Sequence, residues 1–441
     1  MGVAVTPDTA AAPPGARLNR SVVLCVVLAV FAQESVWNFY DAQVPAQLRE
    51  HVSSAGLVGL LMGLDNVFGV LVQPWTGFHA DRLARTERGR WPVIGVGAVL
   101  CAVPFALIPR ADGLPALIAC IAAFALMANG FKGTTETLVS DYVAPAERGR
   151  AQGFVMAGVS LTVVVSSLIS LLVVDRSVTL AFAIPPLLML LLLAAAWAGL
   201  GRRHTHRAVH RPAADEADFA SPWDVVKELI RDPSRTRLLL MLGIFCFAGM
   251  WNALRSLTTP YGMEVLGLTR GESGGLALPG AVAFLAAVVP IAYLSSRLGQ
   301  LTAIRYGAGV FVAGLLIGFA APDRAMTMVS MAVATVGYAV FAVNALVALW
   351  QLAPNDRVLG TYTGLYTVAS ASAMAAGPAL LGVVVDMTGW RFMLLDAAVF
   401  GTLTFAVFTR LARRPTGRAP EPAVPLRTSC HSPVIRREEG T

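Results

Sequence analysis

The sequence has little charge and few cysteines. Only 14% of its 441 residues are charged, whereas 56% are hydrophobic. Soluble domains are about a quarter charged, so this composition excludes an ordinary water-soluble enzyme and a disordered chain. The five cysteines lie at irregular spacing and form no CxxC or Cys/His cluster. We therefore predict neither disulfides nor a zinc site.

Other sequence signals are also missing. There is no G-x-x-x-x-G-K-[ST] loop, so the chain does not carry an ATP-hydrolysing site of that type. The first eighteen residues lack a charged region followed by a cleavage site, which argues against a signal peptide. The sequence contains no metal-binding motif and no catalytic dyad, which argues against an intramembrane enzyme or receptor. We expect no enzymatic activity and no cofactor.

What the sequence does contain is a series of long apolar stretches. Each is about long enough to cross a bilayer as a helix, and none shows the alternation of a β-barrel strand. They lie at 20–42, 55–78, 91–109, 114–139, 153–174, 177–200, 238–258, 273–295, 302–320, 325–350, 358–383 and 391–411. The prediction is an all-α membrane protein with twelve transmembrane helices.

The basic residues orient these spans. Of 34 Lys and Arg residues, 26 fall on the side of the termini, six on the other side, and Lys132 and Arg255 within spans. The positive-inside rule then makes both termini cytoplasmic. We expect a plasma membrane location, of the bacterial inner-membrane type. The net charge of +7 is explained by topology and anionic lipid, so we do not expect nucleic-acid binding.

One long polar stretch divides the spans into six and six. The expected organisation is a cytoplasmic tail (1–19), a six-helix bundle (20–200), a linker (201–237), a second bundle (238–411) and a cytoplasmic tail without predicted order (412–441). Within the linker, residues 223–230 have the pattern of a short amphipathic interfacial helix. Its three histidines could bind a metal, but a solvated linker is favoured.

The two halves repeat each other at an offset of about 210 residues. The turn Asp141-x-x-x-Pro145-x-x-Arg148 after the fourth span has a counterpart in Pro354-x-x-Arg357 after the tenth. Two six-helix repeats imply a binding site between them near the membrane midplane, with rocking of the halves for alternating access.

A basic motif follows the second span. Gly77-x-x-x-Asp81-Arg82, followed by Arg85, Arg88 and Arg90, resembles the loop motif of the major facilitator superfamily. In such a motif the Asp81 carboxylate can hold neighbouring arginines and latch the inner gate. The resemblance covers residues 20 to 411 and implies the fold of two pseudo-symmetric six-helix bundles. With this motif, we assign Lys132, Glu136, Asp141 and Arg148 to gating.

The extended motif, which ends at Pro92, looks most like the sucrose-type and glycoside-pentoside-hexuronide sugar:cation symporters. Trp37-Asn-Phe-Tyr-Asp41 in span 1 and Leu64-Asp65-Asn66 in span 2 add to this resemblance. Gly89 lies one position off the usual spacing, and Lys132 stands where that group usually has Arg. Drug exporters often carry Gly-Pro in span 5, which has no proline here.

Ionisable residues inside the spans indicate where a driving ion could bind, because each is costly in hydrocarbon. Four acids, Glu34, Asp41, Asp65 and Glu136, face two bases, so two acids stay unpaired. An unpaired buried carboxylate prefers its protonated form, and we assign ion coupling to Asp65 and Glu34. Position 69 is glycine rather than a second acid, which favours protons over sodium. Lys132 and Glu136, four residues apart, are expected to form a salt bridge, for which a structural role is favoured and gating is the alternative.

Polar stripes suggest which residues contact substrate. The assigned residues lie on helical faces of spans 1, 2, 7 and 11: Asn38, Gln73, Asn252, Arg255 and Tyr366. Tyr338 and Asn344 are weaker candidates. Arg255 could clamp an anionic group or balance Asp65 or Glu34. Asp41, Asp386 and Asp396, near the outer face, are expected to be solvated.

These features predict a secondary active transporter that takes up a sugar or glycoside together with protons. The alternative is proton-driven efflux of an amphiphilic metabolite or drug by the same fold. The expected partners are the small-molecule substrate, the coupling proton and the lipid bilayer, and we expect a monomer.

Overall fold

The structure is a computed structural model that describes residues 19–83, 89–144, 147–201, 235–352 and 359–413. Within these ranges, twelve helices are long and apolar enough to cross a membrane. This confirms the predicted all-α architecture and the number of spans. The interfacial helix expected at 223–230, Arg85, Arg88 and most of both tails lie outside the described residues.

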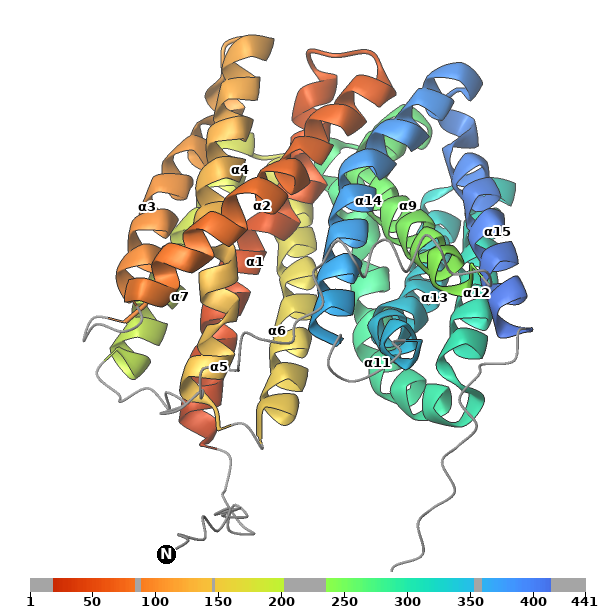
Figure 1. Cartoon of the computed structure of the whole chain (residues 1–441). Coiled ribbons are helices and arrows are strands. Elements are labelled where there is room, and N and C mark those ends of the chain that lie inside the picture. The colour runs from red at the N-terminus through yellow and green to blue at the C-terminus, as the bar shows by residue number, and fades with distance from the viewer. Residues whose placement is uncertain (1–18, 84–88, 145–146, 202–234, 353–358, 414–441) are drawn as a thin grey trace, which may run out of the picture.

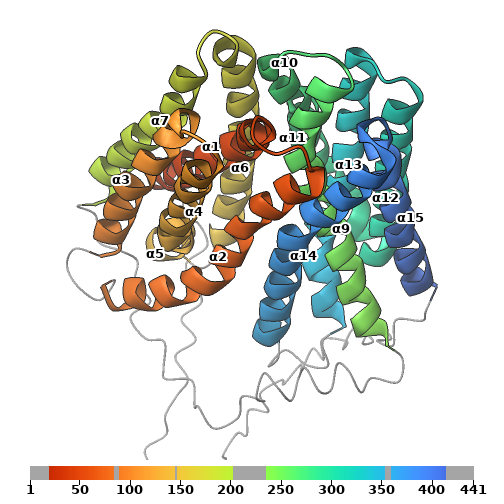
Figure 2. The same ribbon diagram turned by 90° about the horizontal axis from the view of Figure 1, so that it is seen from above.

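The first six spans form one group of helices and the last six form another beside it (Figures 1 and 2). The first group is α1 (Arg20–Arg49), α2 (Ala55–Leu83), α3 (Trp91–Leu107) with η1 (Ile108–Arg110), α4 (Leu114–Glu136) with α5 (Leu138–Tyr142), α6 (Arg148–Ile169) with η3 (Ser170–Val174), and α7 (Val178–Leu200). The second group is α9 (Thr236–Glu264), α10 (Arg270–Gly274) with η5 (Gly275–Ala277) and α11 (Leu278–Leu298), α12 (Gln300–Ala320), α13 (Arg324–Gln351), α14 (Leu359–Thr388), and η7 (Trp390–Phe392) with α15 (Met393–Ala412). We call the side where α1 begins and α15 ends the inner side, and the opposite side the outer side.

Local chemistry marks several helix ends. The side chain of Asn19 accepts a hydrogen bond from Val22 N at the start of α1, and Asp323 does the same for Met326 N at the start of α13. Such caps satisfy backbone donors that have no partner within the helix. Gly113 and Gly389 adopt φ of 89° and 95° in outer connections, a conformation that other residues rarely tolerate.

Helices α1 and α9 extend beyond the apolar runs that predicted them. The predicted spans end at 42 and 258, yet the helices continue through Pro45 to Arg49 and through Pro260 to Glu264. Their outer turns are buried against protein, as shown by Leu48 and Tyr261, which are 0% and 1% exposed. Because protein rather than lipid covers these turns, the edge of the apolar run does not mark the end of the helix.

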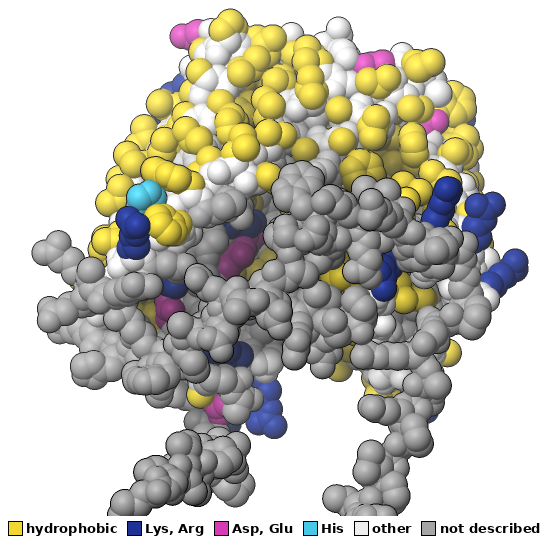
Figure 3. Space-filling model, viewed as in Figure 1, with side chains coloured by type: hydrophobic (Ala, Val, Ile, Leu, Met, Phe, Trp, Pro, Cys, Tyr) yellow, Lys and Arg dark blue, Asp and Glu magenta, His cyan; other side chains and the backbone are white. Residues whose placement is uncertain are grey.

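Hydrophobic side chains cover the described surface of the helices in the view of Figure 3, and basic side chains gather toward its lower part. Leu71, Trp75 and Val289 are 67%, 67% and 73% exposed. An apolar exterior of this extent is stable in contact with lipid but not in contact with water. The exterior therefore agrees with a membrane-embedded protein.

The halves pack tightly at the outer side through α2 and α14. A Cβ atom at Gly59 or Gly63 would overlap the backbone of Pro378 or Ala375. On the inner side, a Cβ atom at Gly77 would meet no described atom within 4 Å. Figures 1 and 2 show the two helices meeting at their outer ends and separating toward the inner side. The described helices thus form an inward-facing arrangement.

Candidate functional site

A cavity of about 240 Å³ lies between the two halves, with walls from α1, α6, α9, the segment from α10 through η5 to α11, and α13. Its polar lining comes from both halves: Glu34, Asn38, Asp41, Ser160, Ser166, Ser167, Arg255, Thr258, Thr259, Ser273, Thr335 and Tyr338. Such a position between repeats is where transporters with internal repeats place their substrate site.

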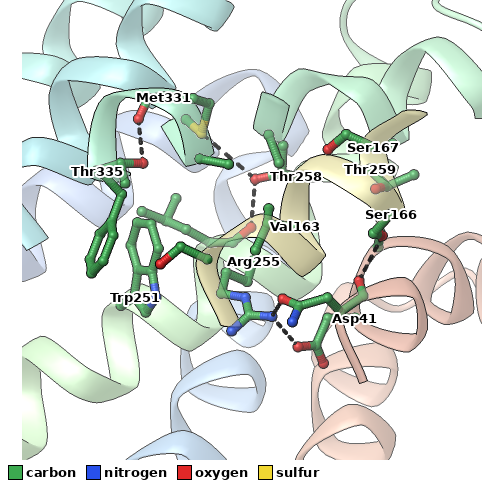
Figure 4. Close-up of a pocket in the computed structure, with 18 of the residues that line it drawn as sticks. Asp41, Val163, Ser166, Ser167, Trp251, Arg255, Thr258, Thr259, Met331 and Thr335 are labelled. Carbon is green, nitrogen blue, oxygen red and sulfur yellow. Dashed lines mark hydrogen bonds and ion pairs between the residues drawn. The ribbon is translucent and has the colours of Figure 1, made fainter. Parts of the chain in front are cut away.

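Arg255 joins the halves at this cavity. Its Nη2 lies 2.5 Å from Asp41 Oδ2 and 2.8 Å from Asn38 Oδ1 (Figure 4). Asn38 Nδ2 in turn donates to Thr162 Oγ1 at 2.6 Å. The expectation that Asp41 is simply solvated is therefore wrong, and Arg255 pairs with Asp41 rather than with Asp65 or Glu34. Sequence spacing could not show this, because the two residues lie on helices from different halves.

Lys132 forms an ion pair between helices. Its Nζ lies 2.8 Å from Glu34 Oε1 and 5.5 Å from the centre of the Trp37 ring. The prediction that Lys132 forms a salt bridge with Glu136 on the same helix is wrong, because Lys132 pairs with Glu34 on α1 instead. The reason is that α1 faces α4 at this level, so the carboxylate of Glu34 reaches the ammonium group. Glu136, one turn away, forms no ion pair among the described side chains.

Asp65 is buried at 9% exposure and forms no ion pair with the described residues. Its carboxylate accepts hydrogen bonds from the backbone and side-chain nitrogens of Asn66, both at 2.6 Å. Asn129 on α4 donates to Asp65 O at 3.0 Å and accepts from Gln73 Nε2 at 2.9 Å. Asp65 and Gln73 thus share one face of α2, and the two ion pairs leave Asp65 and Glu136 as the acids without a base.

The structure brings only part of the predicted substrate set to the cavity. Asn38 and Arg255 line it, whereas Gln73, Asn252 and Tyr366 are not among its lining residues. Asn252 Nδ2 donates to Met374 O at 2.7 Å, a contact between helices of the same half. The weaker candidate Tyr338 does line the cavity.

An aromatic wall completes the cavity on the side of the second half. The rings of Trp251 and Tyr338 stack with centroids 4.1 Å apart and an angle of 8°. Stacked, amphipathic rings offer an apolar face beside polar groups. Sequence analysis missed Trp251, because a single tryptophan in an apolar span carries no periodic signal.

The hydroxyl row on α6 was also missed. Thr162, Ser166 and Ser170 repeat every four residues, and Ser166 Oγ donates to Asn38 O at 3.1 Å. The signal is present in the sequence, because polar residues four positions apart on span 5 lie on one helical face, as the polar residues of span 1 do. Of this row, Ser166 lines the cavity, where Ser160 and Ser167 add further hydroxyl groups (Figure 4).

Four of the predicted gating residues are described at the inner side: Arg82, Arg90, Asp141 and Arg148. Arg90 Nε is 2.8 Å from Asp141 Oδ2, and the Arg148 guanidinium donates to Ser140 O at 2.8 Å and Val143 O at 3.2 Å. Arg82 lies over the Phe78 ring at 4.4 Å. These contacts stay within the first half. The side chain of Asp81 is outside what the structure describes, so its role in the gate stays a prediction.

The arrangement suits binding and ion exchange. In the described part of the chain, no three His, Cys, Asp or Glu side chains come close enough together to hold a metal ion. The cavity instead offers hydroxyls, an amide, an aromatic wall, the Arg255–Asp41 ion pair, and Glu34, which is paired with Lys132 outside the lining. These groups can hold a polar small molecule and exchange protons as the ion pairs open and close.

Comparison with known proteins identifies the family. The sequence pattern of the Major Facilitator Superfamily matches residues 22–307 and 281–438. No curated protein matches the sequence significantly.

Solved structures share the fold at low sequence identity. A bacterial homolog of the human lysosomal transporter Spinster, in an inward-facing and unoccupied conformation, matches with a TM-score of 0.72 and 16% identity, covering 90% of this chain and 98% of that one. The nucleoside transporter NupG matches with a TM-score of 0.68 and 12% identity, covering 90% and 100%. The peptide transporter POT in complex with sulfate matches with a TM-score of 0.66 and 14% identity, covering 89% and 95%. The chain belongs to the major facilitator superfamily and is a secondary transporter, not an enzyme.

Proposed function

We propose that this transporter takes up a sugar or glycoside together with protons by alternating access. The observation that carries the proposal is the cavity between the halves, where hydroxyl and amide groups face the Trp251–Tyr338 stack. Polyhydroxylated rings bind such surfaces, because their C–H faces stack on aromatic rings while their hydroxyls form hydrogen bonds. The resemblance of the extended loop motif to sugar:cation symporters supports the same substrate class.

The size of the cavity favours a small substrate. Its volume of about 240 Å³ lies below the roughly 300–1,000 Å³ typical of sites for drug-sized ligands. Arg255 is already balanced by Asp41, so the cavity presents little net charge to a ligand. Both features favour a compact neutral molecule over a large or strongly anionic one.

Proton coupling is proposed to involve Asp65 and Glu34. Asp65 is buried and has no basic partner among the described residues, and an acid in such a position within a membrane span commonly marks a proton path. Glu34 borders the cavity and is held by Lys132, so substrate binding can change how strongly that ion pair holds. This gives a physical route by which substrate and proton occupancy influence each other.

The decisive experiment compares wild type with Asp65→Asn in proteoliposomes under an imposed pH gradient. Radiolabelled monosaccharides, disaccharides and aryl glycosides serve as a substrate panel. We expect Asp65→Asn to retain exchange of labelled for unlabelled substrate but to lose accumulation against a gradient. Asp112→Asn, an exposed acid in an outer connection, is the matched control and should behave like wild type. Accumulation that stays proton-dependent in Asp65→Asn contradicts the assignment.

Efflux of an amphiphilic metabolite is the second candidate, and the apolar part of the cavity supports it. Val159, Val163, Leu254, Phe284 and Met331 form this part of the lining. Direction is tested by two measurements. Substrate-dependent alkalinisation outside whole cells supports uptake with protons, whereas accumulation in inverted vesicles under an inward-acid gradient indicates export.

A further inference from the structure

Two acids at the outer side bind the start of a helix in the opposite half. Asp386, near the end of α14, accepts hydrogen bonds from Ala55 N at 2.7 Å and Gly56 N at 3.0 Å. It also accepts from Ser54 Oγ at 2.6 Å. The carboxylate thus occupies the N-terminus of α2, so Asp386 is exposed, as expected, but also hydrogen-bonded across the halves.

Asp175 makes the corresponding contact in the other direction. It follows η3 at the outer end of span 5 and accepts from Gly271 N at 2.8 Å and Thr269 Oγ1 at 2.6 Å. These donors lie at the start of span 8, which runs through α10 and η5 into α11. A carboxylate from the first half therefore caps a helix of the second half, as Asp386 does in reverse.

The two contacts are related by the internal repeat. Asp175 and Asp386 are about 210 positions apart, the offset that relates the two halves. Ser54 and Thr269, which supply the hydroxyl donors, are separated by a similar number of positions. Each site therefore consists of the same three parts: an acid, a hydroxyl and a helix N-terminus.

The helix starts carry glycine where the carboxylates approach. A Cβ atom at Gly271 would lie 2.6 Å from Asp175 Oδ2, and one at Gly56 would lie 3.1 Å from Asp386 Oδ2. Any larger residue at Gly271 would push the carboxylate away from the backbone N–H. The sequence thus supplies the acid and also the space that the contact requires.

These contacts join surfaces that must separate when the outer side opens. Unpaired N–H groups and the helix dipole make a helix N-terminus favourable for a carboxylate. In an outward-facing state, both carboxylates would leave their helix starts and return to water. We propose that Asp175 and Asp386 are paired latches that hold the outer side closed and set the balance between inward- and outward-facing states.

Other contacts across the outer side act beside the latches. Arg49 forms an ion pair with Glu264, and Arg270 Nη1 lies 3.0 Å from Glu50 Oε1. Because these ion pairs persist when a latch is removed, each single latch variant should shift the balance rather than abolish the closed state.

The test measures the outer separation of the halves without substrate. Spin labels are placed at Asp112→Cys and Arg391→Cys, two exposed outer positions in different halves, in a chain whose five native cysteines are replaced by serine. Electron–electron distance measurements in nanodiscs then give the ratio of open to closed molecules. Loss of one helix cap changes an equilibrium by about fivefold. We expect about that increase for Asp175→Ala and Asp386→Ala alone, and about the product of the two in the double variant.

Asp323→Ala is the matched control, because Asp323 accepts from Met326 N at 2.9 Å at a helix start within its own half. It should leave the open-to-closed ratio unchanged. The proposal is overturned if the double variant keeps the wild-type distances, or if Asp323→Ala shifts them equally. Should an alanine variant fail to fold, Asp175→Asn and Asp386→Asn are measured in its place, and each should give a smaller shift in the same direction.

Discussion

At the scale of single residues, the pair formed by Glu34 and Lys132 permits a direct test. Glu34→Gln leaves the ammonium group of Lys132 without its partner in a partly buried setting. We expect it to lower the free energy of unfolding by about 1–3 kcal/mol, less than for a fully buried pair. Unfolding in mixed micelles, followed by tryptophan fluorescence, measures the change.

The double variant Glu34→Gln with Lys132→Met should recover much of this loss, because no unpaired charge remains. Glu136→Gln is the comparison on the same helix as Lys132, and we expect a smaller effect. An equal loss in Glu136→Gln would show that the intrahelical pair carries the stability.

The sequence identified which residues are ionisable within the spans, but not how they pair. Spacing of four residues favoured Lys132 with Glu136, whereas the structure pairs Lys132 with Glu34 and Arg255 with Asp41. Pairing between helices depends on how they face each other, and no local pattern encodes that. The predicted surplus of two acids nevertheless holds among the described side chains.

At the scale of elements, the contact between α2 and α14 depends on glycine. Gly59→Ala would place a methyl group against the backbone of Pro378, which cannot move as a flexible side chain can. We expect a loss of about 1–3 kcal/mol in the free energy of unfolding, as for other overpacked sites. Gly95→Ala on α3 is the control, since its Cβ would meet nothing within 4 Å.

The same substitution should also ease opening of the outer side, because that contact exists only when the side is closed. The spin-label pair at positions 112 and 391 reports this as a larger open population in Gly59→Ala. An unchanged stability and an unchanged distance distribution would together contradict the close packing of α2 and α14.

Helices were largely predictable because a helix that faces lipid must be apolar over its whole length. The predicted spans therefore match the observed helices in number and order. The ends of the helices were predictable only where a helix leaves the lipid and its sequence becomes polar. Helices α1 and α9 continue past their apolar runs because protein rather than lipid buries their outer turns.

At the scale of the whole molecule, the assignment of inner and outer sides rests on the distribution of basic residues. We expect native Cys430 to resist a membrane-impermeant maleimide in intact cells and to react after permeabilisation. In a chain lacking the other four cysteines, Asp112→Cys should react in intact cells. The reverse pattern would show that the termini lie outside the cell, so that the inner and outer sides would have to be exchanged.

The sequence by itself determined the membrane setting, the twelve helices, their repeat and the family, because apolar length, charge placement and local motifs are properties of the chain. Only the tertiary structure decided which charges pair, which helices line the cavity and which side is closed. These depend on contacts between residues about 100 to 330 positions apart, as in Asn38 with Thr162 and Asp386 with Ser54. Some of these contacts join helices of one bundle and others form where the two bundles pack face to face, and no periodicity within one helix specifies either packing.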